Sequence, residues 1–227
     1  MSKYELTGET REAGGHILYR IRAVRDVNVL VGKGDLGGWI ESENNLSHKG
    51  RCWVAGEACV YGHAKVGNNA VVYDDAKVYD DAKVYGNARV HGHAEVGGNA
   101  QVCDCAEVSG NALVWGHAMV GSYAAVSGHA KVGSSAVVSG YAQVCGDAHV
   151  VKASDYMAFQ NVWSSMRWFT YTKSNRKWKV GCFYGSGDEL IQKAYKDGDI
   201  KGKCYEAIVR AVEQIEAAMA EEKKEEL

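Results

Sequence analysis

Residues 82–102 read AKVYGNARVHGHAEVGGNAQV, and this stretch decides the fold. Alanine recurs at every sixth position, and a valine follows each alanine after one intervening residue. The same repeat, Ala-x-Val-x-x-x, runs sixteen times without an insertion from Ala58 to Val150, and a looser form of it reaches upstream to Ile40. An α-helix completes a turn in about 3.6 residues, so a strict period of six does not predict a helix.

Each repeat combines a very short strand with a corner. Side chains two residues apart point to the same side of an extended chain, so the alanine and valine face inward and the residue between them faces outward. Gly, Asp, Asn or Ser fills the first corner position in almost every repeat, as at Asp74 and Gly86, and such residues accept unusual backbone angles. These features predict a β-solenoid whose coils stack at about 4.8 Å, with a narrow interior of small side chains. The complete absence of proline fits a backbone ladder in which every amide donates.

The composition of the 227 residues excludes several classes of protein. Apolar residues make up 46%, which is enough for a packed core. The net charge of −2 gives no electrostatic reason to expect nucleic acid or a membrane surface as a partner. No apolar run of about 18 residues predicts a membrane span, and residues 1–5 lack a signal-peptide core, so we expect a cytoplasmic protein. The seven cysteines are an odd number and are expected to be reduced thiols.

Residues 84–89, Val-Tyr-Gly-Asn-Ala-Arg, resemble the hexapeptide repeat of left-handed parallel β-helices. The resemblance implies that three repeats form one triangular coil of about 18 residues, and that residues 37–150 form about six coils. The left hand is implied by the resemblance alone, because the general rule for parallel crossovers favours the right hand. Proteins of this kind commonly form trimers packed along their faces, so a homotrimer is expected.

The sequences of residues 4–10, 18–23 and 34–41 resemble those of the YdcK-type β-solenoid proteins, which occur in bacteria, phages and prophages. Residues 167–194 also resemble part of the small C-terminal domain of phage members. The resemblance implies a phage or prophage origin, and the host cytosol as the location. The domain organisation then predicted is an N-terminal cap and lead-in at 1–45, the β-helix at 46–153, and a small α+β domain at 154–227.

The C-terminal segment itself predicts a hairpin and two helices. Strands are expected near 166–172 and 178–184, and Ser186 with Glu189 three residues later predicts a capped helix start. Gly198 and Gly202 are expected to separate this helix from a second one at 204–222. Apolar residues recur in the second helix at 3-4-3-4 spacing, namely Tyr205, Ile208, Val212, Ile215 and Met219. We expect this stripe to pack on its own domain, with a two-heptad coiled-coil seam as the alternative.

Histidines are the first candidates for chemistry, because hexapeptide acyltransferases often use one as a general base. If the protein were an enzyme, His93 and His117 would be the candidate catalytic residues. Both stand in Gly-His-Ala corners where Asn87 stands in another repeat, so a polar corner role is the favoured interpretation. A metal site of the γ-class carbonic anhydrase kind needs three converging histidines, whereas His93 and His129 are expected about 10 Å apart, so no metal or other cofactor is predicted. The repeats also carry no inserted loop of the kind that usually encloses a substrate.

Aromatic side chains form columns when every eighteenth residue is taken. One outward column reads Tyr61, Tyr79, Gly97, Trp115 and Gly133, and another places Tyr123 beside Tyr141. Exposed aromatic residues on a rigid face suit a protein interface, so the five aromatic residues are the candidate binding residues. Ring stacking that stabilises the solenoid itself is the alternative.

The expected function is therefore a non-enzymatic β-solenoid scaffold that acts by protein–protein interaction. Self-association as a trimer and binding of a host protein are the expected partnerships, with blocking of a host or defence protein as one role. An acyl-CoA-dependent acyltransferase is the alternative. Small-nucleotide binding or a purely structural, self-associating solenoid are further alternatives.

Overall fold

The computed structural model describes residues 2–225, with side chains described up to residue 219. The chain divides into two compact units, Met1–Tyr156 and Met157–Leu227. Among the described residues, no helix is both long enough and apolar enough to cross a membrane. The predicted fold class, mainly β with a parallel solenoid and a small C-terminal α+β part, is confirmed.

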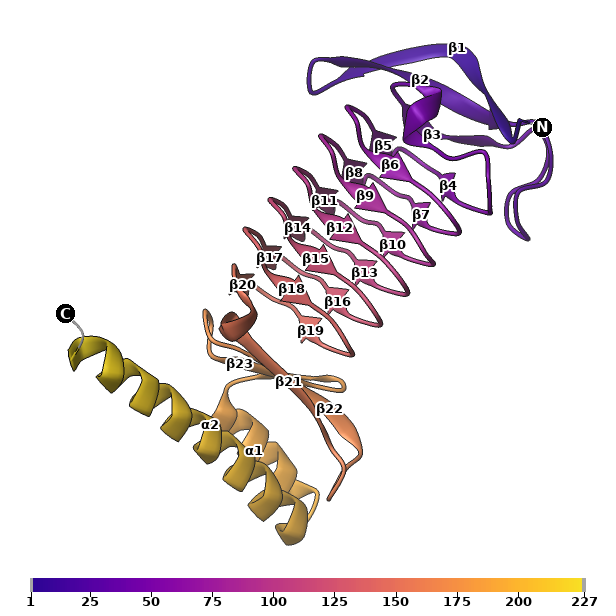
Figure 1. Ribbon diagram of the computed structural model, residues 1–227. Helices are drawn as coiled ribbons and strands as arrows, with labels where there is room; N and C mark the ends of the chain where they lie inside the picture. The colour runs from indigo at the N-terminus through magenta and orange to yellow at the C-terminus, as the bar shows by residue number, and fades with distance from the viewer. Residues whose placement is uncertain (1, 226–227) are drawn as a thin grey trace. The chain divides into compact units, whose positions relative to one another are not determined.

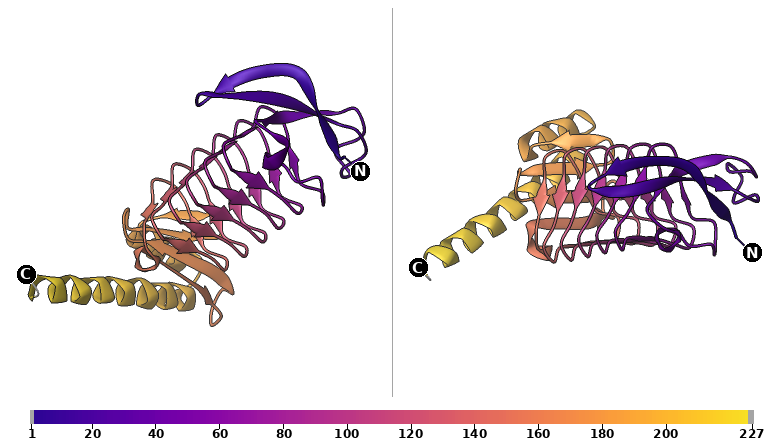
Figure 2. Two further views of the ribbon diagram at one scale, coloured as in Figure 1. Left: turned by 45° about the horizontal axis from the view of Figure 1, so that its top comes forward. Right: turned by 90° about the horizontal axis from the view of Figure 1, so that it is seen from above.

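The first unit is a parallel β-solenoid of about six coils (Figures 1 and 2). Its strands, two residues long except for β3 (Leu36–Ile40), form three sheets, called here face 1 (β3-β5-β8-β11-β14-β17-β20), face 2 (β4-β7-β10-β13-β16-β19) and face 3 (β6-β9-β12-β15-β18). Each strand pairs in parallel with the strand one coil on, so that Val60 lies opposite Val78. The strands are β4 (Trp53–Val54), β5 (Cys59–Val60), β6 (Lys65–Val66), β7 (Val71–Val72), β8 (Lys77–Val78), β9 (Lys83–Val84), β10 (Arg89–Val90), β11 (Glu95–Val96), β12 (Gln101–Val102), β13 (Glu107–Val108), β14 (Leu113–Val114), β15 (Met119–Val120), β16 (Ala125–Val126), β17 (Lys131–Val132), β18 (Val137–Val138), β19 (Gln143–Val144) and β20 (His149–Val150).

The interior of the solenoid holds the alanines and valines of the repeat. All of them from Ala58 to Val150 are at most 1% exposed. Backbone hydrogen bonds join successive coils, as when the Lys83 amide donates to the Ala100 carbonyl at 2.9 Å. Small inward side chains allow the three faces to approach closely, and the ladder satisfies the buried backbone groups.

The corners use left-handed backbone conformations. Glycine supplies most of them, and the non-glycine corner residues with φ between 54° and 59° are Asn68, Asp74, Asp80, Asp104, Ser122 and Ser134. The aspartates also connect coils, because the Asp74 carboxylate accepts a hydrogen bond from the Gly92 amide at 3.1 Å, and Asp104 accepts one from Ser122 at 2.9 Å. These carboxylates therefore satisfy amides at the neighbouring corner.

An N-terminal hairpin extends face 1. Strands β1 (Tyr4–Ala13) and β2 (His16–Ala23) are antiparallel, β2 pairs with β3 (Leu36–Ile40), and β3 pairs in parallel with β5. The looser upstream repeat is confirmed, since Ile40 lies opposite Val60 and Leu46 opposite Val66. The 3-10 helix η1 (Glu43–Asn45) follows β3, and its buried Asn45 side chain donates to the Gly62 and Ala64 carbonyls at 3.0 and 2.9 Å.

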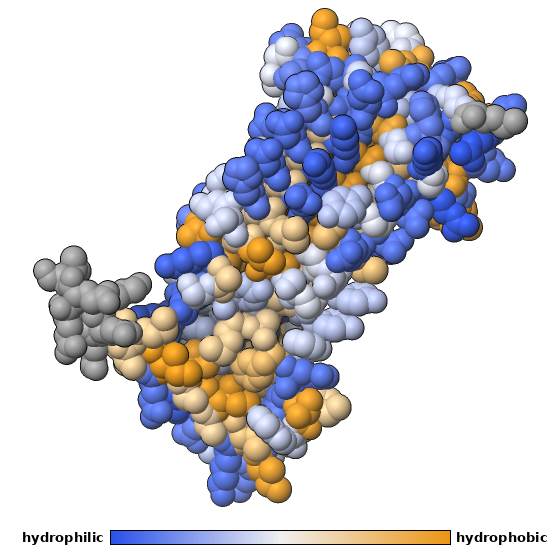
Figure 3. Space-filling view, in the orientation of Figure 1, coloured by the Kyte–Doolittle hydropathy of each residue, from blue (hydrophilic) through white to orange (hydrophobic). Residues whose placement is uncertain are grey.

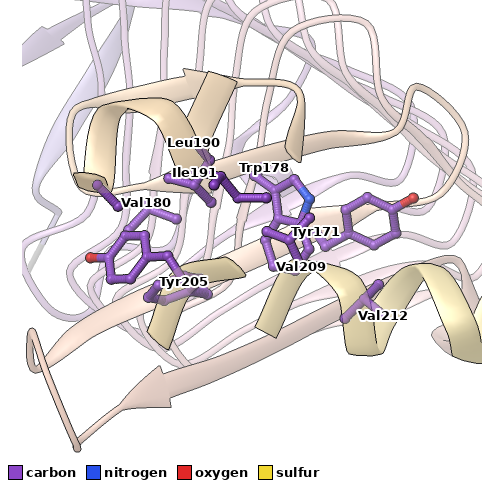
Figure 4. Packing of buried hydrophobic residues seen from close by; sticks show 10 residues of the cluster. Tyr171, Trp178, Val180, Leu190, Ile191, Tyr205, Val209 and Val212 are labelled. Atoms are coloured by element: carbon purple, nitrogen blue, oxygen red, sulfur yellow. The ribbon is translucent and has the colours of Figure 1, made fainter. Parts of the chain in front are cut away.

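The second unit is built on a four-stranded antiparallel sheet and two helices. The sheet order is β21 (Tyr156–Asn161), β22 (Arg167–Thr172), β23 (Lys177–Val180) and β24 (Phe183–Gly185), and the helices are α1 (Gly187–Lys196) and α2 (Asp199–Glu225). A second 3-10 helix, η2 (Ala153–Asp155), precedes β21. Trp178, Leu190, Tyr205 and Val209 are among the residues of its core (Figure 4). Phe169 belongs to the same core.

The structure corrects the predicted strands of this unit. The expected strand at 178–184 is two strands, because the chain turns at Gly181 with a φ of 55° and returns as β24. Strand β21 was not predicted at all. The capped helix start is confirmed, since Ser186 Oγ accepts from the Glu189 amide at 3.3 Å and the Glu189 carboxylate accepts from the Ser186 amide at 2.7 Å.

The second helix begins earlier than predicted. Gly202 lies inside α2, where a Cβ atom would come within 2.2 Å of the Tyr195 ring, so this glycine permits close helix contact and does not end a helix. The apolar stripe is buried at Tyr205 and Val212, which confirms packing on its own unit for the first half. Ile215 and Met219 are 49% and 43% exposed, so the second half extends past that core.

Two glycine substitutions test the corner geometry. Gly86 has a φ of 74°, and a Cβ atom there would lie 2.7 Å from the Asp104 amide nitrogen, whereas nothing lies within 4 Å of a Cβ atom at Gly67. We expect Gly86→Ala to lower the free energy of unfolding by about 1–3 kcal/mol. The control, Gly67→Ala, should leave it within about 0.5 kcal/mol. Urea denaturation followed by circular dichroism measures the stability of both variants. Equal midpoints for the two would contradict the corner geometry described for Gly86.

Candidate functional site

The candidate binding residues separate into two groups in the structure. Tyr61, Tyr79 and Trp115 form an aromatic column along face 1. The rings of Tyr61 and Tyr79 are stacked, with centroids 5.6 Å apart and planes 12° apart. A Cβ atom at Gly97 would lie 2.5 Å from the Tyr79 ring, and one at Gly133 would lie 2.2 Å from the Trp115 ring. These rings therefore lie over glycines of the next coil, as a stacking ladder requires.

The N-terminal hairpin covers the start of this column. The His16 ring lies 5.1 Å from that of Tyr61, and a Cβ atom at Gly14 would lie 3.2 Å from the same ring. Burial, with a smaller contribution from Tyr79, raises the pKa of the Tyr61 hydroxyl to about 12. The column thus joins the hairpin to the solenoid, which favours a stabilising role for Tyr61.

Tyr123 and Tyr141 lie at a different place, on the corner that follows face 3. Their rings are stacked at 5.0 Å with planes 4° apart, and the side chains are 58% and 45% exposed. Val137, on the adjoining strand β18, is 42% exposed, and Met119 occupies the matching position of β15. We call these four residues the edge aromatic patch. Apolar surface is visible around β15 and β18 in Figure 3. Of the five predicted interface residues, these two tyrosines are exposed, whereas Tyr61, Tyr79 and Trp115 are half-buried.

The two candidate catalytic histidines do not meet. His93 and His117 are exposed and follow different faces, face 2 and face 1 respectively. His93 Nδ1 lies 3.9 Å from an Asp75 carboxylate oxygen, which is beyond hydrogen-bond distance. The structure therefore assembles no shared acid–base pair from His93 and His117.

A different histidine has the contacts that these two lack. The His91 ring is stacked on Tyr73 at 4.6 Å, and its Nε2 lies 2.9 Å from a Glu107 carboxylate oxygen. Its Nδ1 faces Asp74 at 3.8 Å. Both ring nitrogens face carboxylates and one ring face is covered, so these contacts connect three neighbouring coils. The sequence does distinguish His91 from the other candidates, because it does not stand in a Gly-His-Ala corner.

A groove of the solenoid unit was not predicted from the sequence. It has a volume of about 960 Å³ and is bordered by His16, Glu41, His63, Lys65 and Lys83. The groove lies beside η1 at the N-terminal coils, and the lysines come from β6 and β9 of face 3. The available signal was a pair of lysines eighteen residues apart, which the coil period places side by side.

Comparison with known proteins adds no family assignment. No protein-family model matches the chain, and no curated protein matches it significantly. The functional argument therefore depends on the residues and their geometry.

The raised pKa of Tyr61 predicts alkaline sensitivity. A phenol with an ordinary pKa near 10.0 in the unfolded chain and about 12 in the folded chain stabilises fully below pH 10, and this stabilisation is lost as the pH rises toward 12. We expect the melting temperature of Tyr61→Phe to fall less than that of the wild type between pH 9 and 11.5. Thermal melts across this range measure the effect, with Tyr123→Phe as the exposed control that should follow the wild type. Identical slopes for Tyr61→Phe and the wild type would contradict the assignment.

Proposed function

We propose that the protein is a non-enzymatic scaffold that binds a protein partner through the edge aromatic patch. The observation that carries the proposal is the exposed, stacked pair of Tyr123 and Tyr141 beside the exposed Val137. Tyrosine is enriched among the residues that dominate interface energies, and it offers a large apolar area with few rotatable bonds. The pair is unlike Tyr61, which neighbouring side chains cover.

The rigidity of the solenoid supports this proposal. The backbone around Tyr123 is fixed by the ladder, since the Tyr123 amide donates to the Gly140 carbonyl at 2.9 Å. Stacking of the two rings restricts their rotamers before any partner arrives. A surface that is ordered in advance loses less conformational entropy on binding, so more of the contact energy appears as affinity.

Two classes of partner compete for this surface. The resemblance to phage-borne solenoids makes a bacterial host protein the first class, with inhibition of a host or defence protein as the corresponding role. The resemblance to trimeric hexapeptide proteins makes a second copy of the chain the other. In either case the apolar patch would form the centre of the interface, with polar corner residues around it.

A paired capture experiment tests the proposal. Tagged wild type and the double variant Tyr123→Ser/Tyr141→Ser are used as bait in a bacterial lysate, and the captured protein is identified by mass spectrometry, purified and titrated. We expect a stoichiometric partner whose dissociation constant rises by about 30-fold or more in the variant, since interface hot spots contribute about 2 kcal/mol or more. The control variant is Arg89→Ser, at an exposed position of β10 on face 2.

Sedimentation equilibrium of the same proteins separates the two classes. A wild-type trimer that the double variant dissociates would assign the patch to self-association. A wild type that captures no protein and remains monomeric would overturn the proposal. Equal capture by wild type and double variant would place the interface elsewhere on the molecule.

A further inference from the structure

The N-terminal coils of face 3 carry an unusual arrangement of charge. Strands β6 and β9 pair in parallel with Lys65 directly opposite Lys83. Like charges at directly opposed positions of a sheet destabilise it. The two lysines also border the groove of about 960 Å³ beside η1.

Other basic residues at the same position of the repeat have different neighbours. Lys77 lies opposite Glu95, with Nζ 3.0 Å from the carboxylate, and Arg89 lies opposite Glu107. Lys131 is followed one coil on by His149. Within the described strand columns, Lys65 and Lys83 are the one place where two lysine or arginine side chains are adjacent.

One of the two carboxylates that border this groove, that of Glu41, is already engaged. One oxygen of Glu41 lies 3.0 Å from His16 Nδ1, and the other accepts a hydrogen bond from the Gly62 amide at 2.7 Å. The hydrogen bond with His16 is the largest cause that lowers the pKa of this carboxyl, so Glu41 stays ionised but satisfied. Asp81 is the other carboxylate at this groove, and no ion pair joins it to either lysine in the described part of the chain.

A smaller hollow adjoins the lysine pair on the other side. Lys65 and Lys83 border it together with Glu43, Asn44, Ser47 and Tyr85, and its volume is about 450 Å³. The Glu43 carboxylate lies 3.9 Å from His48 Nε2. The Tyr85 hydroxyl donates to the Gln101 side-chain oxygen at 3.1 Å, which fixes the ring at the end of the hollow. Two cationic groups with an aromatic ring beside them are the features that bind a phosphate joined to a planar base.

We propose that this groove binds a small phosphate ester of the nucleotide class. Its phosphates lie between the Lys65 and Lys83 ammonium groups, and its planar base lies against Tyr85. The bound anion neutralises the like-charged pair, whereas Lys77 and Arg89 each have a glutamate on the next coil. The site is separate from the edge aromatic patch, so it stands whether or not that patch binds a protein.

Isothermal titration calorimetry tests the site with inorganic pyrophosphate and ATP as probes, without magnesium and at low salt. We expect both probes to bind the wild type, and Lys65→Glu and Lys83→Glu to weaken each by about 10-fold or more. The control is Lys131→Glu, which changes the same charge within an identical Ala-Lys-Val repeat on face 1 and should retain wild-type affinity. Lys65→Glu should also melt at the same temperature as the wild type or higher, because it places opposite charges in register, so lost binding is not lost folding.

The variant Tyr85→Ala separates binding of the nucleotide's planar ring from binding of its phosphates. It should weaken ATP and leave pyrophosphate unchanged, because only ATP has a ring to stack. Absence of binding of both probes to the wild type at millimolar concentration would overturn the proposal. Equal weakening by Lys131→Glu would also overturn it, because the binding would then report net charge and not a site.

Discussion

The backbone ladder between coils is the interaction on which the rest of this structure depends. An amide in one coil donates to a carbonyl in the next, as from Lys83 to Ala100, and the same bond recurs along all three faces. With no insertion between Ala58 and Val150, this ladder pairs coils of equal length, eighteen residues each. It also brings every side chain beside the one eighteen residues away. Stacked tyrosines, opposed lysines and the aspartate–amide bonds at the corners all follow from this register.

The ladder explains why the surface matters more than the interior for function. From Ala58 to Val150 the interior repeats alanine and valine without variation, so it does not distinguish one of these coils from another. Differences appear only at the outward and corner positions. Face 3 shows this well, since Lys65 and Lys83 occupy its N-terminal strands and Val137 its last strand. A single face thus presents a cationic region and an apolar region on one rigid support.

The sequence was sufficient to predict the solenoid, because its period determines the register and the register determines which residues face inward. It was not sufficient for the C-terminal unit, where single residues decide the outcome. Gly181 turns one expected strand into two, and Gly202 permits a helix contact where a helix break was expected. The aromatic columns on the surface also followed from the period. The columns were correct, but whether a ring such as Tyr61 is covered depends on a hairpin that pairs through β3, and Tyr123 has no such cover.

The coil period also constrains how this chain can change in evolution. Removal of one complete coil shortens the solenoid but leaves every later residue on its own face. Removal of a single six-residue repeat keeps the interior intact, yet it rotates all later residues by one face. Tyr123 and Tyr141 would then move to another corner, away from the face that carries Lys65. Insertions or deletions that keep two surface regions on the same face are therefore restricted to whole coils.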